Sequence, residues 1–260
     1  MKIYQIDAFT DKVFSGNPAA VCPLETWLPD ETLQQIAMEN NLAETAFYVK
    51  QPDNEFHIRW FTPAVEVDLC GHATLATAYV LFNYEKYEGQ EIIFNSRSGK
   101  LLVEKENDLL TLDFPADTLS EVVLSPELCE GFNYRPIQAF KGKTDYMLVF
   151  DNEEQIKTIE VDLHKIAQLK GRGIIVTAKG NEVDFVSRFF APQSGINEDP
   201  VTGSAHTSLT PYWAGQLNKN ELSAIQLSDR RGYLTCKNLG ERVKISGKAK
   251  TFLIGEIFYH

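Results

Sequence analysis

The chain has 260 residues, a formal net charge of −11 and 43% hydrophobic residues, as expected for an ordinary globular protein of one or two domains. Because an acidic protein repels phosphate backbones and anionic lipid, nucleic-acid and membrane-surface functions are disfavoured. No segment has the roughly 18 apolar residues of a membrane span and no signal peptide precedes the strand-like residues 2–9, so we expect a cytoplasmic protein.

The first half alternates strand-like and helical patterns. Residues 30–40 place apolar side chains at helical spacing after an acidic start, which predicts a first helix. An apolar strand follows Glu44, and an aromatic-rich strand ends at Pro63. The segment that begins near Gly71 is apolar nearly all round, which is typical of a buried helix.

The second half repeats this order. Four segments match in sequence order: 28–37 with 160–167, 56–63 with 185–192, 70–74 with 202–207, and 96–103 with 229–236. Strand–loop–helix segments can resemble one another by chance, but four ordered matches favour an internal duplication. A helix is therefore expected after Gly203, as after Gly71.

The duplication predicts an α+β fold of two similar, pseudo-symmetric domains, each a curled sheet or barrel around a central helix. We expect an N-terminal domain at 1–117 and a C-terminal domain at 118–260, with the linker near 117–133. The apolar segment 251–260 has no counterpart at the end of the first copy. We expect it to complete the N-terminal domain.

Each copy places a glycine at a helix start, Gly71 and Gly203. Glycine lets a ligand approach the backbone, and the unpaired N–H groups and dipole of a helix start attract anions. Alternatively, each glycine only permits a tight turn. A small carboxylate is expected between the domains at both helix starts. Since neither motif contains lysine or arginine, its positive surroundings would come from backbone N–H groups.

The two copies differ at the residue before the glycine, which is Cys70 in the first and Thr202 in the second. A thiol can take a proton, whereas a threonine hydroxyl cannot do so alone. The pair of thiols that a two-base racemase would use is therefore absent. Cys70 is either reactive or a small packing residue.

The copies also differ at Glu44, because the matching segment 170–176 contains no acid. A carboxyl group at the start of a buried strand is poorly solvated, which raises its pKa towards the range of general acid–base catalysis. The alternative is a surface or helix-capping glutamate.

The loop before the second helix adds Asp199, a hydrogen-bond acceptor for a substrate or an Asx turn ahead of Pro200. His72 and His206 are candidate ligands or hydrogen-bonding groups. A metal site of Cys70, both histidines and Asp199 lacks His-x-x-x-His or CxxC spacing, so no metal is expected. No Gly-x-Gly-x-x-Gly, P-loop or Gly-x-Ser-x-Gly pattern points to a nucleotide cofactor or a serine hydrolase.

Four segments carry a specific resemblance to a known family: 7–18, 41–47, 68–74 and 198–206. They resemble the PhzF-like, or phenazine biosynthesis-like, family, which has the diaminopimelate epimerase fold, and the match spans the whole chain. The second cysteine of diaminopimelate epimerase is missing. The named reaction of the family is isomerisation of a dihydro-hydroxyanthranilate. The motifs do not establish that this chain catalyses the same reaction.

The resemblance implies a site between two barrel-like domains, no cofactor, and a catalytic glutamate at Glu44. By the same resemblance, the substrate is contacted by His72, Asp199, Ser204 and the backbone around Gly71 and Gly203.

Three hypotheses follow. The first is a cofactor-independent, one-base isomerase or epimerase that acts on a small carboxylate, with a homodimer as a further expectation. The second is a non-catalytic binding or adaptor protein on the same scaffold, and the third an amino-acid racemase that uses Cys70 with Glu44. Intact Glu44, His72, Asp199 and Ser204 favour the first.

Overall fold

The computed structural model describes residues 1–259 in two compact units. The first comprises Met1–Asp113 together with the C-terminal residues from Ser246, and the second comprises Phe114–Ile245. The sequence predicts the boundary between the two domains at residues 117 and 118, and it predicts that the chain returns to the first domain at residue 251. In the part of the chain described, no helix is long and apolar enough to cross a membrane.

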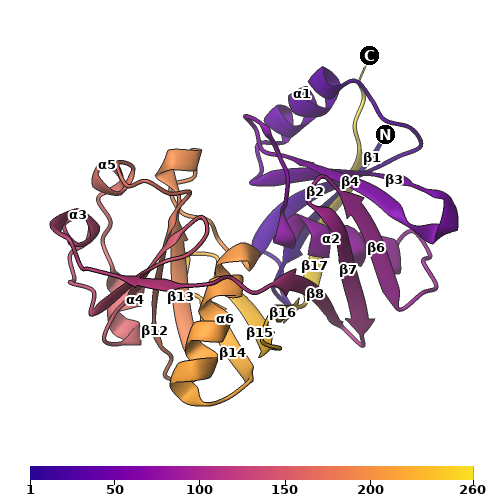
Figure 1. The fold of residues 1–260 in the computed structure, drawn as a ribbon. Helices are drawn as coiled ribbons and strands as arrows, with labels where there is room; N and C mark the ends of the chain where they lie inside the picture. The colour runs from indigo at the N-terminus through magenta and orange to yellow at the C-terminus, as the bar shows by residue number, and fades with distance from the viewer. Residues whose placement is uncertain (260) are drawn as a thin grey trace. The chain divides into compact units, whose positions relative to one another are not determined.

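The first unit consists of strands around one buried helix (Figure 1). Its strands are β1 (Lys2–Ala8), β2 (Asn17–Leu24), β3 (Glu44–Lys50), β4 (Phe56–Phe61), β5 (Glu66–Val67), β6 (Glu91–Ser96), β7 (Gly99–Glu106), most of β8 (Leu109–Pro115) and β17 (Ala249–Glu256). Its helices are α1 (Asp30–Asn40), α2 (Gly71–Asn83) and the 3-10 turn η1 (Pro52–Asn54).

Helix α2 is the centre of the first unit. Every residue from His72 to Ala78 is buried, as are Val80 and Leu81, and the helix packs against β1, β2 and β3. A helix without a polar face must be covered on all sides, so the sheet curls around it. The predicted first helix and the predicted buried helix are both present.

Strand β17 closes the first unit from the far end of the chain. It pairs antiparallel with β1, from Lys2 opposite Glu256 to Ala8 opposite Ala249, while β2 pairs with the other edge of β1. The first and last strands of the chain are therefore neighbours.

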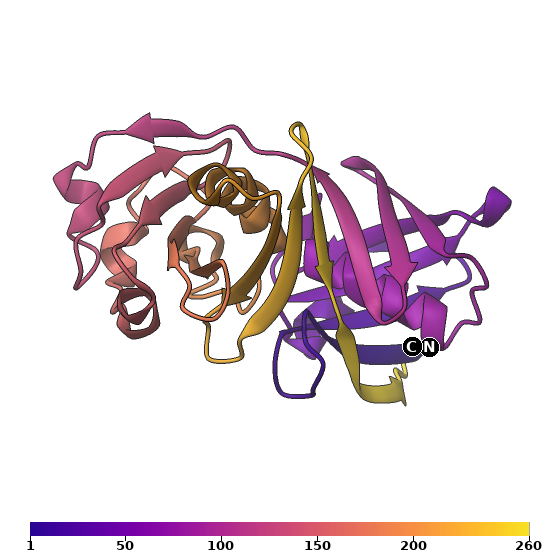
Figure 2. The ribbon, with the colours of Figure 1, turned by 90° about the horizontal axis from the view of Figure 1, so that it is seen from below.

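The second unit is built in the same way around helix α6 (Gly203–Leu217), which Figure 2 shows enclosed by strands. Its strands are β9 (Ser120–Val122), β10 (Gln138–Lys141), β11 (Tyr146–Val149), β12 (Ile174–Lys179), β13 (Phe185–Phe190), β14 (Glu221–Gln226), β15 (Gly232–Asn238) and most of β16 (Arg242–Gly247). The shorter helices are α3 (Pro126–Cys129), α4 (Glu153–Thr158), α5 (Leu163–Ile166) and the 3-10 turn η2 (Pro192–Ser194).

The strand pairings repeat between the units. In the first unit, antiparallel and parallel pairs alternate. The antiparallel pairs are β1–β2, β3–β4 and β6–β7, and the parallel pairs between them are β2–β3 and β4–β6. The second unit shows the same alternation. The antiparallel pairs are β10–β11, β12–β13 and β14–β15, and the parallel pairs between them are β11–β12 and β13–β14. Thus the α+β fold with a curled sheet around a central helix in each unit is confirmed.

One ion pair is repeated as well. Arg59 donates from Nε and Nη2 to both oxygens of Glu66, each at 2.7 Å, and Arg188 donates in the same way to Glu198 at 2.6 and 2.8 Å. Both arginines hold a loop that leads from the aromatic-rich strand to the central helix.

Two segments of the second unit differ from expectation. The match at 160–167 forms only the four-residue helix α5, preceded by the separate helix α4, whereas α1 is continuous. Asp162 caps α5 through the backbone N–H groups of His164 and Lys165, and glycines at 171 and 173 follow soon after. Residues 117–133, expected as a linker, contain β9 and α3, and β9 pairs with β10.

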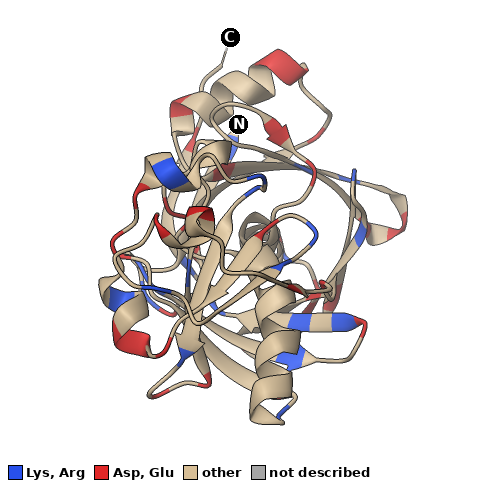
Figure 3. Cartoon of the chain, turned by 60° about the vertical axis from the view of Figure 1, so that its left-hand side comes forward, with Lys and Arg blue, Asp and Glu red and all other residues tan. Residues whose placement is uncertain are grey.

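Charged residues are distributed over both units. Figure 3 shows lysines and arginines interspersed with acidic residues along the chain, and the composition gives 25 basic against 36 acidic residues.

Candidate functional site

In the first unit, Glu44 and His72 meet at one end of the curled sheet. Glu44 is the first residue of β3, and His72 is in the first turn of α2. Glu44 Oε2 lies 3.2 Å from His72 Nε2, and the two side chains are only 13% and 5% exposed. Because β2 and β3 run parallel, with Ala19 opposite Glu44, the start of β2 lies at the same end.

Asn17, the first residue of β2, contacts the ring of His72. Its Nδ2 lies 3.2 Å from His72 Nδ1, and the contact is a hydrogen bond in the tautomer whose Nδ1 is unprotonated, because an amide nitrogen can only donate. In that tautomer the proton is on Nε2, which lies 3.2 Å from Glu44 Oε2. Burial lowers the pKa of His72 to about 3, so the ring is neutral near pH 7.

Glycine at position 16 is required for this arrangement. Gly16 has φ +68°, and an added Cβ would collide with the carbonyl oxygen of Ala8. The chain can therefore turn sharply into β2 and present Asn17 to the imidazole only with glycine at this position. Neither Gly16 nor Asn17 was assigned a role from the sequence, although both lie in the segment that resembles the PhzF-like family.

Cys70 lies close to both His72 and Glu44. It precedes α2, is 6% exposed, and its Sγ is 3.5 Å from His72 Nδ1. The ligand atoms of Glu44, Cys70 and His72 all lie within 4.8 Å of one another. Cysteine, histidine and glutamate are residue types that bind metal ions, and the expectation that no metal is required stays a prediction.

In the second unit, Asp199 and Thr202 form a hydrogen-bonded pair. Thr202 Oγ1 donates to Asp199 Oδ2 at 2.5 Å. The buried Gln226 holds both residues, because its Nε2 donates to Thr202 Oγ1 and to the carbonyl of Asp199 while its Oε1 accepts from the backbone N–H of Thr202. The sequence identified Asp199 and Thr202 but not Gln226, which lies on β14.

Ser204, in the first turn of α6, contacts an arginine that the sequence did not point to. Arg172 Nη2 donates to Ser204 Oγ at 2.8 Å, and Arg172 Nε and Nη2 also donate to the two oxygens of Asp145 at 3.0 and 2.5 Å. The expectation that only backbone N–H groups supply positive charge near the helix starts is therefore wrong for the second unit. Arg172 is 30 or so residues before the motif, so spacing alone could not place it there.

His206 is a buried residue whose contacts are with the interior of the second unit. Its Nδ1 lies 2.8 Å from the carbonyl oxygen of Thr202, its ring packs beside Phe185, and it is completely buried. Thr74 is the equivalent residue of α2, and its Oγ1 donates in the same way to the carbonyl of Cys70 at 2.6 Å. Both side chains therefore bond to the residue before the helix.

Gly71 and Gly203 are the first residues of α2 and α6, and neither helix has an acidic residue in its first turn. Their proposed contact with a substrate carboxylate stays a prediction. Within the described residues, the polar side chains divide into a first-unit cluster (Asn17, Glu44, Cys70 and His72) and a second-unit cluster (Arg172, Asp199, Thr202, Ser204 and Gln226).

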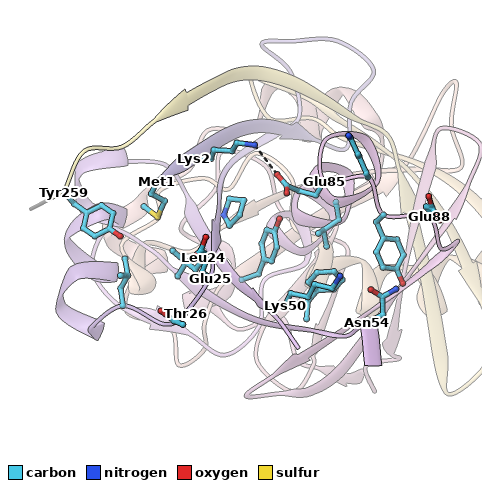
Figure 4. Close-up of a pocket in the computed structure, with 17 residues that line it drawn as sticks. Met1, Lys2, Leu24, Glu25, Thr26, Lys50, Asn54, Glu85, Glu88 and Tyr259 are labelled. Atoms are coloured by element: carbon cyan, nitrogen blue, oxygen red, sulfur yellow. Dashed lines mark ion pairs between the residues drawn. The ribbon is translucent and has the colours of Figure 1, made fainter. Parts of the chain in front are cut away.

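A cavity of about 850 Å³ lies elsewhere in the first unit (Figure 4). Leu81 and Glu85, at the C-terminal end of α2, line it, and Glu85 forms a 3.9 Å ion pair with Lys2. Since α2 rises about 1.5 Å per residue, its last residue, Asn83, is about 17 Å along the helix from His72. None of the predicted site residues lines this cavity.

The comparisons place this fold in a known class of proteins. A hydroxyproline epimerase from Agrobacterium vitis shares the fold alone, with a TM-score of 0.63 at 9% identity over 98% of this chain and 91% of that one. The fold is thus that of the epimerase-like α+β proteins.

Closer relatives identify the family. Residues 6–255 match the phenazine biosynthesis-like proteins, PhzC-PhzF. An uncharacterized isomerase of Pseudomonas aeruginosa is 50% identical over 257 residues, covering 99% of this chain and 98% of that protein. A crystal structure of a PhzF-family phenazine biosynthesis protein from Enterococcus faecalis gives a TM-score of 0.97 at 48% identity, covering 99% of both chains. The chain belongs to the phenazine biosynthesis-like family, and the resemblance of its motifs is confirmed.

Proposed function

We propose that this protein is a cofactor-independent isomerase that moves a proton on a small carboxylate-bearing substrate, with Glu44 as its single general acid and base. The proposal rests mainly on the contact between Glu44 Oε2 and Nε2 of the buried His72. Relatives that are 44–51% identical to this chain are named isomerases, which supports the class of reaction.

The first-unit cluster suits proton transfer. Glu44 is held in a largely buried position, with 13% of its side chain exposed, within contact distance of His72. Burial lowers the pKa of His72 to about 3, so its ring is neutral near pH 7 and does not form a full ion pair with the carboxylate. Its Nε2–H is available as a donor to the carboxylate or to negative charge on a substrate.

The reaction conserves protons and electrons. The Glu44 carboxylate takes a proton from a substrate C–H group, and the electron pair of that bond passes into the conjugated system next to the substrate carboxylate. The protonated Glu44 then returns the proton to a different carbon. Glu44 ends as a carboxylate, so no oxidant or reductant is consumed.

The thiol-based alternative is less well supported. Cys70 is 6% exposed, and its sulfur lies 3.5 Å from His72 Nδ1. A two-base racemase that uses thiols would need a second one, and the second unit has Thr202 at the position equivalent to Cys70.

The test is solvent deuterium exchange into a panel of small amino and hydroxy carboxylic acids. Once a substrate is found, Glu44→Gln should keep the fold and lower the rate by about 10²–10⁴, the usual contribution of a positioned acid or base. Glu31→Gln makes the same chemical change at an exposed residue of α1 and should leave the rate unchanged. Near-normal turnover by Glu44→Gln would overturn the single-base mechanism.

A further inference from the structure

The cavity at the C-terminal end of α2 contains a buried hydroxyl group that the fold does not use. Tyr48 lines this cavity and is only 4% exposed, and its Oη has no hydrogen-bond partner among residues 1–259. A buried hydroxyl without a partner costs free energy, and such groups are rare in folded proteins. Since Tyr48 belongs to the wall of a cavity, a bound molecule can supply the missing hydrogen bond.

Strand β3 connects this cavity with the first-unit cluster and also separates the two. Glu44 and Tyr48 are four residues apart on β3, so their side chains lie on the same face of the strand. Four residues of a strand span about 13 Å. Glu44 therefore lies beside the start of α2, whereas Tyr48 lies in the cavity beyond its end. The cavity is a separate place in the first unit.

Glu85 provides a hydrogen-bond acceptor in the same cavity. Its Oε1 accepts from Tyr4 Oη at 2.8 Å and lies 3.9 Å from Lys2 Nζ, whereas its Oε2 has no partner among the described residues. Burial and, next to it, the charge of Glu85 raise the pKa of Tyr48, so the hydroxyl stays protonated and lies within electrostatic reach of the carboxylate. Helix α2 has no basic residue in its last turn, so its negative end is uncompensated and favours a cation.

An aromatic wall lies next to these polar groups. The ring centroids of Tyr48 and Phe56 are 5.7 Å apart and those of Phe56 and Tyr87 are 5.9 Å apart, in edge-to-face contacts. All three residues line the cavity, together with the buried Leu81. Aromatic rings pack well against other rings, and their faces also attract ammonium groups. The wall therefore fits a ligand that carries an aromatic side chain.

The charges around the cavity are balanced. It is lined by three lysines and three glutamates, namely Lys2, Lys50, Lys86, Glu25, Glu85 and Glu88 (Figure 4). Lys50 and Lys86 are exposed and form no ion pair within the described residues. A purely cationic ligand would leave these lysines unmatched, and a purely anionic ligand would be repelled by Glu85. A zwitterion satisfies charges of both signs.

We propose that this cavity binds a free α-amino acid with an aromatic side chain. The ammonium group donates to Glu85 Oε2 and Tyr48 Oη, the carboxylate lies towards Lys50 and Lys86, and the ring packs against the aromatic wall. The volume of about 850 Å³ is within the range of small-molecule sites. This binding site does not include Glu44 and does not rest on the function proposed above.

Three probes of similar shape test the assignment of charges. Phenylalanine carries both charges, phenethylamine only the ammonium group, and hydrocinnamate only the carboxylate. In calorimetric titrations of the full chain at pH 7, phenylalanine should bind with a dissociation constant of about 1 mM or tighter. Each of the other two should bind at least about threefold more weakly, because each lacks one charged contact. Equal affinity for hydrocinnamate and phenylalanine would overturn the proposal.

The variant Tyr48→Phe removes only the hydroxyl group and keeps the ring. It should weaken binding of phenylalanine by about threefold to tenfold. Its stability without ligand should be unchanged or higher, since the fold loses no hydrogen bond, whereas a purely structural tyrosine predicts lower stability and unchanged affinity. Tyr233→Phe makes the same change at an exposed tyrosine of the second unit and should alter neither quantity. Unchanged affinity in Tyr48→Phe would contradict the proposed contact.

The variant Glu85→Gln removes the charge and keeps an acceptor for Tyr4. It should weaken binding of phenylalanine by about tenfold or more and should affect hydrocinnamate less, because only phenylalanine has an ammonium group. Glu182→Gln changes an exposed glutamate of the second unit and is the matched control. A loss of affinity that is equal for both compounds would show that Glu85 does not contact the ammonium group and would overturn the proposal.

The place of binding is tested separately from the proposed function. On addition of phenylalanine, the backbone amide signals of Leu81 and Tyr87 should shift and those of Gly71 and His72 should not. Glu44→Gln should bind phenylalanine as wild type does, whether or not it catalyses proton transfer. Shifts confined to Gly71 and His72, or a changed affinity in Glu44→Gln, would place the compound at the first-unit cluster and overturn the proposal. No saturable binding of any probe would also overturn it, because water alone would then satisfy Tyr48.

Discussion

At the scale of single residues, the two buried histidines have different partners and the same protonation state. His72 accepts from Asn17 and faces Glu44, and His206 bonds to the carbonyl of Thr202. Burial lowers the pKa of His72 to about 3, and burial, partly offset by the hydrogen bond to Thr202, lowers the pKa of His206 to about 4. Both rings fold in the neutral form.

These shifts predict a loss of stability in mild acid. In the unfolded chain each histidine has a pKa of about 6.5, so below that pH the unfolded chain binds protons that the folded chain does not. The contribution of each neutral histidine to the free energy of unfolding is fully present above pH 6.5. It is lost as the pH falls towards the folded-state pKa, by about 1.4 kcal/mol per pH unit for each histidine. Urea unfolding at pH 7 and pH 5 measures this slope.

The variant His206→Gln should reduce the slope by about the contribution of one proton. His164 is exposed, and His164→Gln serves as the control that should leave the slope unchanged. An unaltered slope in His206→Gln would show that this residue does not fold in the neutral form.

At the scale of secondary-structure elements, glycines decide how chain segments enter the first-unit cluster. Gly16 turns the chain into β2 at φ +68° and lies against the carbonyl of Ala8. By contrast, Gly215 lies in α6 with open space around its Cβ position and without a positive φ. The same substitution should therefore have opposite effects at the two positions.

Gly16→Ala should destabilise the protein by about 1–3 kcal/mol, because alanine is strained at positive φ and its methyl group would strike backbone. Gly215→Ala should stabilise it by about 0.5–1 kcal/mol, because alanine has the higher helix propensity and nothing obstructs it. Chemical denaturation measures both. Equal effects at both positions would contradict the backbone requirement at Gly16.

At the scale of the whole molecule, the first unit depends on both ends of the chain. Strand β1 lies between β2 and β17, and β17 comes from the C-terminal segment. The backbone N–H of Ile257 also donates to the carbonyl of Met1 at 2.7 Å. Without β17, one edge of β1 and the apolar side chains beneath it would be exposed to water.

A chain that ends at Lys248 lacks β17 and should lose protection of the β1 amides in hydrogen exchange, because those amides lose their partner strand. A chain that ends at Phe258 keeps all of β17 and is the control. Protection of Ile3 and Gln5 that survives in the shorter chain would show that β17 does not hold the first unit together.

Much of the fold could be predicted from local patterns in the sequence. The helix at 30–40, the buried helix that begins at Gly71 and its counterpart at Gly203 follow from the spacing and number of apolar residues. The repeated order of segments predicted two units of one design, which the strand pairings reproduce. The helix expected at 160–167 is short, because capping by Asp162 and the glycines that follow are local signals that outweigh the likeness to the first copy.

The sequence by itself determined which chemical groups the site could contain, since Glu44, His72, Asp199 and Ser204 stand out by type and by position in the repeat. Only the tertiary structure decided their partners. Asn17 and Arg172 reach His72 and Ser204 across 55 and 32 residues of sequence, through strands and loops whose positions depend on pairing register. Register is a cooperative property of the folded sheet, so no local pattern in the sequence records which side chains it brings into contact.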